Sequence, residues 1–180
     1  RGIPSLTRSI SVQIVALATD TEIDAFVLTR EQPNHILVAK EKSLSLGAEY
    51  RIICWAHEGS NADGPSLAMG DQTIEALGHS IYVDVPLATT IASITIFPNN
   101  PAIKINEEIM LQPSALDAGG EVVPVQAGNW VWGKAPESDA IVLDIISGIV
   151  IGKQEGSSII TAMDLETGLT GQTTVTVVPF

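Results

Sequence analysis

The chain has 180 residues, of which 45% are hydrophobic, and its 21 acidic side chains outnumber nine basic ones, for a formal net charge of −12. Because such an acidic surface repels phosphates and anionic lipid head groups, the composition disfavours nucleic-acid binding and membrane association. The single cysteine, Cys54, excludes an intrachain disulfide, and no apolar run is long enough for a transmembrane helix.

The length favours two domains of about 90 to 100 residues, each able to bury its own core. The sequence begins at Arg1 without a methionine or the apolar core of a signal peptide. We therefore expect a processed product or an excised piece.

Short alternating apolar stretches in the first half predict strands, and no segment has a convincing helical period. Strands are expected at residues 9–14, 22–30, 36–40, 49–56 and 79–87, with an extra strand or a long hairpin at 67–77. Loops are expected at 31–34 and 59–65, where Gly, Pro, Asn and Asp gather.

The segment around Tyr50 carries a family resemblance. Leu44 lies six residues before Tyr50, and alternating apolar positions follow up to Ala56. This pattern resembles the E–F corner and F strand of a fibronectin type III domain, over about residues 4–87. The resemblance implies that Tyr50 is a corner tyrosine whose hydroxyl bonds to upstream backbone. The tryptophan that this family usually carries in its second strand is missing.

Residues 86–90 are the expected junction, because a proline and small residues separate the last strand of one half from the first strand of the next. In the second half, strands are expected at 94–98, 102–111, 130–132 and 173–178.

Short apolar strands separated by glycines characterise the second half. They are Trp130-Val131-Trp132, 138–142, 147–152 and 156–162. Over residues 91–178 this series resembles a bacterial immunoglobulin-like domain of group 2. Asn106 stands where that family usually has a glycine, and the resemblance implies a turn there, because asparagine tolerates a left-handed backbone. The two resemblances together imply an all-β chain with two tandem immunoglobulin-like β-sandwiches, at 1–87 and 91–180. Trp132 would then be the core tryptophan, with Trp130 either extending the core or facing a neighbour.

The sequence contains acidic residues and histidines that can bind metals, but we interpret them as ordinary surface residues. Asp20, Glu22 and Asp24 share one strand face, as calcium ligands could, but the glycine-containing ligand loop of calcium motifs is missing. The same holds for two acidic pairs, Asp139 with Asp144 and Asp117 with Glu121. His35, His57 and His79 have no second ligand at zinc spacing. We predict neither a metal nor a cofactor.

The chain also lacks the signatures of catalysis. Neither a Gly-x-Ser-x-Gly motif nor a phosphate-binding glycine loop is present. Cys54 is in phase with Tyr50 and Ile52, on the face expected to be buried, where a thiol is an inert small hydrophobe. We predict that the chain is not an enzyme.

The opposite phase of the same strand supplies candidate contact residues. If Tyr50 and Cys54 point inward, Ile53, Trp55 and His57 point outward, where solvent would favour polar residues. Exposed aromatic side chains are favoured contact anchors. The alternative is that Trp55 is covered within the chain, by residues 67–77 or by the second domain.

The N-terminal arm is a second candidate. Residues 2–17 could pair with the sheet of a neighbouring subunit, with Ile10, Val12 and Ile14 filling a groove.

We therefore predict a non-catalytic extracellular or virion-surface structural module: a filament, phage tail or capsid decoration subunit whose partners are copies of itself or neighbouring domains. The alternatives are a stalk fragment of a bacterial surface adhesin, and a carbohydrate- or receptor-binding module. The aromatic content of 4% makes carbohydrate the weaker choice of ligand.

Overall fold

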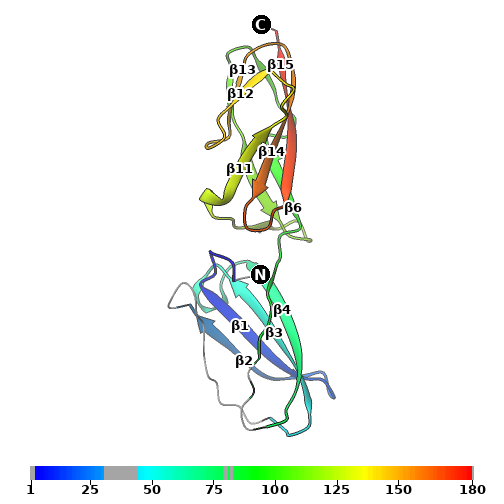
Figure 1. Cartoon of the computed structure of the whole chain (residues 1–180). Helices are drawn as coiled ribbons and strands as arrows, with labels where there is room; N and C mark the ends of the chain where they lie inside the picture. The colour runs from blue at the N-terminus through cyan, green and yellow to red at the C-terminus, as the bar shows by residue number, and fades with distance from the viewer. Residues whose placement is uncertain (1–2, 31–43, 79–80, 82, 180) are drawn as a thin grey trace. The chain divides into compact units, whose positions relative to one another are not determined.

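The computed structural model describes residues 3–30, 44–78, 81 and 83–179. As predicted, the chain is all-β. It divides into two compact units, residues 1–90 and residues 91–180 (Figure 1). Each unit has buried hydrophobic clusters of its own.

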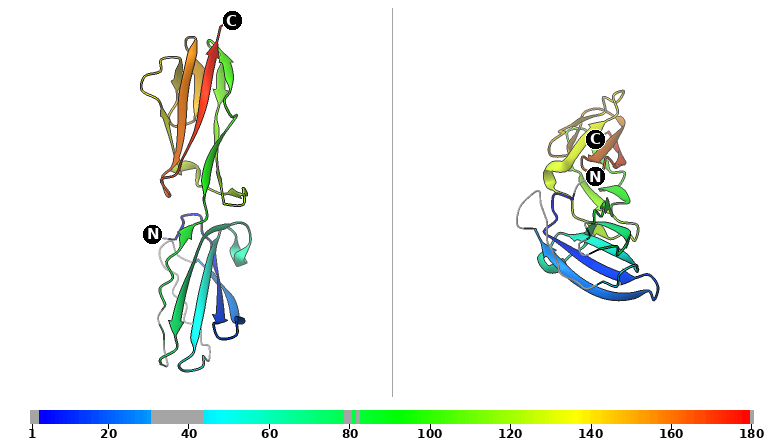
Figure 2. Two further views of the ribbon diagram at one scale, coloured as in Figure 1. Left: turned by 90° about the vertical axis from the view of Figure 1, so that its right-hand side faces the viewer. Right: turned by 60° about the horizontal axis from the view of Figure 1, so that its bottom comes forward.

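The described strands of the first unit form one antiparallel sheet in the order β2-β1-β3-β4-β5, with its long strands side by side in Figure 2. A single 3₁₀ turn, η1 (Ser60–Ala62), lies in the connection expected at 59–65. The strands are β1 (Ser9–Ala16), β2 (Thr21–Thr29), β3 (Glu49–His57), β4 (Ser66–Glu75) and β5 (Ala88–Thr89).

The predicted strands at 9–14, 22–30 and 49–56 are confirmed, and the extra segment at 67–77 is β4. The prediction for 79–87 is wrong, because its described residues, 81 and 83–87, are not in a strand. Strand β4 pairs with β3 along the whole length of β3, so the position next to β3 in the sheet is occupied by β4. The predictions for 31–34 and 36–40 lie outside the described residues.

The inner face of this sheet holds the core of the first unit. Val85 and Leu87, on the segment after β4, and Ile3 near the N-terminus pack against it. The backbone N–H of Ser45 donates to the Tyr50 hydroxyl at 2.8 Å, so the predicted bond from this buried tyrosine to upstream backbone is confirmed.

The second unit is built from short strands in three sheets, β10-β9-β6, β11-β14-β15-β7 and β12-β13-β8. All the pairs are antiparallel except β15 with β7. The strands are β6 (Ser93–Phe97), β7 (Ala102–Lys104), β8 (Glu108–Met110), β9 (Gln112–Leu116), β10 (Val122–Val123), β11 (Trp130–Lys134), β12 (Ile141–Leu143), β13 (Ile149–Gly152), β14 (Gly156–Asp164) and β15 (Thr170–Val178). A 3₁₀ turn, η2 (Ala127–Asn129), precedes β11.

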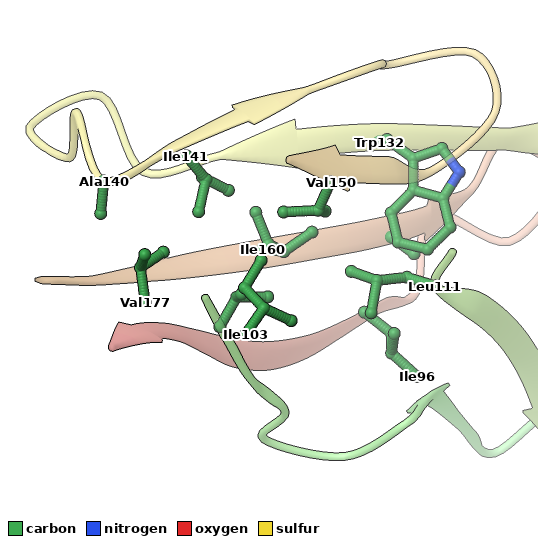
Figure 3. Close-up of a cluster of buried hydrophobic side chains, with 11 residues drawn as sticks. Ile96, Ile103, Leu111, Trp132, Ala140, Ile141, Val150, Ile160 and Val177 are labelled. Atoms are coloured by element: carbon green, nitrogen blue, oxygen red, sulfur yellow. The ribbon is translucent and has the colours of Figure 1, made fainter. Parts of the chain in front are cut away.

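Figure 3 shows the core between these sheets, with Trp132, Leu111 and Ile96 at one end and Ala140 and Val177 at the other. Trp132 is buried, as predicted, and the partly buried Trp130 packs against the same cluster.

One predicted strand of this unit, 102–111, is divided into β7 and β8, which belong to different sheets. The break falls at Asn106, whose φ of 64° confirms the predicted left-handed turn.

Two hairpin turns of this unit share one hydrogen-bonding pattern. In the turn between β12 and β13, the Asp144 carboxylate accepts from the Ile146 N–H and the Ser147 hydroxyl, and the Asp144 carbonyl accepts from the Gly148 N–H. Asp164, Glu166, Thr167 and Gly168 repeat these bonds between β14 and β15. Both turns therefore follow from the local pattern Asp-x-x-Ser/Thr-Gly, because short polar side chains bond their own backbone.

Candidate protein-binding faces

The side chains of β3 alternate between the core and the outer face of the sheet as the sequence predicts. Tyr50 and Cys54 are buried, whereas Ile53, Trp55 and His57 are each half-buried. Burial raises the pKa of the Cys54 thiol, which keeps it protonated and unreactive.

Trp55 belongs to a row that crosses all five strands of the sheet. The row consists of Val27, Ser11, Trp55, Met69 and Ala88, each opposite the next in the strand register. Val27 is 41% exposed and Met69 is 43% exposed, so the sheet presents apolar atoms on the face away from its core. We call this set the Trp55 row. Residues 67–77 lie beside Trp55 as β4, in the same sheet, and not over it.

The flanks of the Trp55 row are polar. Arg51 Nε donates to Asp71 Oδ2 at 2.8 Å, and this contact raises the pKa of Arg51. His57 Nε2 and Ser11 Oγ are 2.9 Å apart, so the His57 ring is held against β1. Protein contact surfaces commonly have an apolar centre and a polar rim. The Trp55 row corresponds to such a centre, and the Arg51–Asp71 pair, whose charges compensate each other, corresponds to the rim.

The strand-addition prediction for Ile10, Val12 and Ile14 is wrong. All three side chains are buried in the core of their own unit. Their strand, β1, has β2 on one side and β3 on the other, so its backbone groups already have partners. Period-two alternation correctly indicated a strand with one buried face but does not tell a central strand from an edge strand.

The N-terminal arm is likewise tied to its own unit. Thr7 is buried, and the Arg8 N–H donates to the His57 carbonyl at 2.8 Å. An Arg30 guanidinium nitrogen donates to the carbonyls of Pro4 and Thr7. These contacts compete with any pairing of this arm to another chain.

A second exposed apolar face lies on the sheet β12-β13-β8 and is missed by the sequence interpretation. Val142 lies opposite Ile151, and Ile149 lies opposite Met110. At the turn of the same hairpin, Ile145 is 64% exposed and Ile146 is 88% exposed. We call these six side chains the hairpin face: Met110, Val142, Ile145, Ile146, Ile149 and Ile151.

Signals for the hairpin face are present in the sequence. Residues 140–143 and 149–151 are unbroken apolar runs with no alternation, which indicates apolar side chains on both faces of a strand. Two isoleucines inside a turn are also unusual, since turns favour polar residues and glycine.

In the described residues, no group of three or more His, Cys, Asp or Glu side chains is placed to hold a metal ion. That part of the chain includes the acidic residues considered above as metal ligands: Asp20, Glu22, Asp24, Asp117, Glu121, Asp139 and Asp144. His35 and His79 lie outside the described residues. The same part contains no helix with the length and apolar character that a membrane crossing requires.

No protein-family model matches the chain. No curated protein sequence matches it either.

Solved structures of low sequence identity resemble it. A C-terminal 282-residue fragment of intimin, in complex with the intimin-binding domain of the translocated intimin receptor, is 13% identical, with 94% of this chain and 51% of that one covered and a TM-score of 0.40. Domains 4–9 of the surface layer protein SbsC are 12% identical, with 100% and 23% covered and a TM-score of 0.41. Mouse cadherin-23 EC22-24 is 13% identical, with 95% and 53% covered and a TM-score of 0.38.

The chain spans about half or less of the length of these three structures. A likeness of this degree supports no functional inference.

Proposed function

We propose that the chain is a non-catalytic, extracellular structural or adhesion-like module that binds protein partners through the Trp55 row. The observation that carries the proposal is the continuous register of Val27, Ser11, Trp55, Met69 and Ala88 across a five-stranded sheet, in which Ser11 is the one polar member. A regular sheet fixes the backbone from which these side chains project, so no loop has to be ordered when a partner covers them.

The partner proposed first is a second copy of the chain. The Trp55 row is flanked by the Arg51–Asp71 ion pair, whose charges compensate each other. Two such faces meet without strong repulsion, despite the net charge of −12. In the second unit, too, we expect partners to bind sheet faces and not strand edges. In residues 91–179 each edge strand has only two to five residues. Such short edges discourage strand addition.

The test is sedimentation velocity of the full chain at rising concentration. We expect self-association that Met69→Lys weakens at least tenfold, because a buried unpaired ammonium is costly. Gln72→Lys, at an exposed position of the same strand, is the matched control and should leave association unchanged. A chain that stays monomeric at all concentrations, or association that Met69→Lys does not alter, would contradict the proposal.

A filament, phage tail or capsid decoration subunit and a stalk fragment are finer forms of this proposal. Electron microscopy of native material separates them, since only an assembly subunit forms ordered polymers. The rival function is carbohydrate binding, which a tryptophan-fluorescence titration with glycans tests. A saturable change that Trp55→Leu removes would replace the protein-binding proposal with a carbohydrate-binding one.

A further inference from the structure

The hairpin face gathers exposed apolar side chains on one sheet and its turn in the second unit. Val142 and Met110 are each 54% exposed, in addition to the two isoleucines of the turn. Strand β15 of the sheet β11-β14-β15-β7 supplies an internal reference, because it directs Thr170, Gln172, Thr174 and Thr176 outward. The large exposed apolar side chains on the rest of that sheet are Ile159 and Val131, at 45% and 40%. Monomeric proteins rarely expose contiguous apolar patches larger than a few hundred Å², and larger ones mark contact sites.

Acidic groups border this face. Glu108 lies opposite Ile151 in the strand register, at the end of the row that begins with Val142. Glu107, the residue before β8, is exposed, and its carboxylate accepts from the Lys104 N–H at 2.7 Å. Asp144 is exposed at the hairpin turn. Hydrogen bonds from the Ile146 N–H and the Ser147 hydroxyl lower the pKa of Asp144, so its carboxylate stays charged next to the exposed isoleucines.

The basic groups of this unit do not offset that charge. Residues 91–180 carry ten acidic and three basic side chains, a formal charge of −7. Lys134 Nζ donates to the Ser138 carbonyl at 2.6 Å, which holds its charge within the loop after β11. Lys153, two residues after Ile151, and Lys104, three residues before Glu107, are both exposed.

We infer that the hairpin face docks a protein partner whose contact surface has an apolar centre and a rim of lysine or arginine, and not a second copy of this chain. The apolar centre supplies the burial that holds the complex together. The acidic border supplies selectivity, because an apolar patch with an acidic rim is repelled and one with a basic rim is attracted. Two hairpin faces in contact would bring Glu107, Glu108 and Asp144 of both copies together. This surface is separate from the Trp55 row, so each can fail without the other.

The experiment uses the full chain and two synthetic β-hairpin peptides with the same Val/Ile face, one with a lysine rim and one with a glutamate rim. Binding is measured by fluorescence anisotropy at two salt concentrations. We expect saturable binding of the lysine-rimmed peptide, weakened by salt, and at least tenfold weaker binding of the glutamate-rimmed one. Equal binding of both peptides, or no binding of either up to about 1 mM, would overturn the inference.

Three variants locate the site. Val142→Lys and Ile146→Lys should each weaken binding of the lysine-rimmed peptide at least tenfold, whereas Thr174→Lys, on the threonine-bearing face, should change it less than twofold. All three positions are exposed or half-buried, so the variants should remain folded, which circular dichroism checks. Sedimentation velocity gives the remaining outcome: a dimer that Val142→Lys dissociates and Met69→Lys does not would assign the hairpin face to a second copy, against the inference.

Discussion

The two Asp-x-x-Ser/Thr-Gly turns of the second unit have the same hydrogen bonds and different surroundings. Asp164 is 1% exposed, and the N–H of the next residue, Leu165, donates to the Asn129 carbonyl near η2. Asp144 is exposed, and the residues after it are Ile145 and Ile146. The comparison shows that five residues are enough to determine the turn, whereas the neighbouring elements determine how much the turn contributes to stability and what it presents to solvent.

The glycines that end the two turns should give the largest difference. Gly148 has a φ of 72°, and a Cβ there would lie 2.5 Å from the Trp132 ring. Gly168 has a φ of 74°, but a Cβ there would meet nothing within 4 Å. Gly168→Ala should therefore cost about 1 kcal/mol from backbone strain alone, and Gly148→Ala about 3 kcal/mol or more, because strain and overpacking add. Urea unfolding monitored by tryptophan fluorescence measures both, and equal losses would contradict this account.

The aspartates come next. Asp164 is buried, and Asp164→Ala leaves the N–H and hydroxyl of the partly buried Thr167 without their acceptor, so we expect it to lower the free energy of unfolding by about 2 to 3 kcal/mol. Asp144→Ala should cost clearly less, because water can reach the same groups in the exposed turn. Thermal unfolding of the two variants is the measurement. The comparison fails if Asp144→Ala is the more damaging change.

The pH dependence of stability gives a smaller effect. Hydrogen bonds from the Ile146 N–H and the Ser147 hydroxyl lower the folded-state pKa of Asp144. The resulting stabilisation is fully present above the unfolded-state pKa of about 3.9 and is lost as the pH falls through the lower folded-state pKa. The wild type should thus be more stable than Asp144→Asn at pH 6, with a gap that closes below about pH 4. Urea titrations at several pH values test this, and Ser147→Ala should narrow the gap. A gap that is constant down to pH 2 would argue against it.

Exchanging the exposed residues of the turns should have the smallest effect on stability. The double variant Ile145→Leu with Ile146→Glu gives the first turn the Leu-Glu pair of the second. We expect the free energy of unfolding to change by less than about 0.5 kcal/mol, because Ile146 is 88% exposed and makes few contacts. A large loss of stability would mean that the isoleucines belong to the core and not to a binding face.

Much of the fold was predictable because it follows from local patterns. Alternation identified β1, β2 and β3, and the spacing around Tyr50 anticipated its bond to the Ser45 N–H. Asn106 marked the left-handed break between β7 and β8. The repeated pattern of Asp144 and Asp164 was equally visible and would have predicted both hairpin turns.

The candidate faces were predictable only in part. The outward phase of Ile53, Trp55 and His57 followed from the inward phase of Tyr50, because side chains alternate along a strand. The partners of Trp55 in the row did not follow, since Val27 and Met69 come from strands distant in sequence. The hairpin face was missed because an unbroken apolar run is equally typical of a strand buried on both sides.

The sequence by itself determined the class of fold, the turns and the phase of the main strands, because period-two alternation and short side-chain-to-backbone bonds act over a few residues. Only the tertiary structure decided which strands are neighbours, and hence that β1 is central and that Ile10, Val12 and Ile14 are core residues. It also decided which apolar side chains have no cover, as at Met69 and Ile146. Strand order and solvent exposure depend on pairing between distant segments, and a local pattern does not specify its partner.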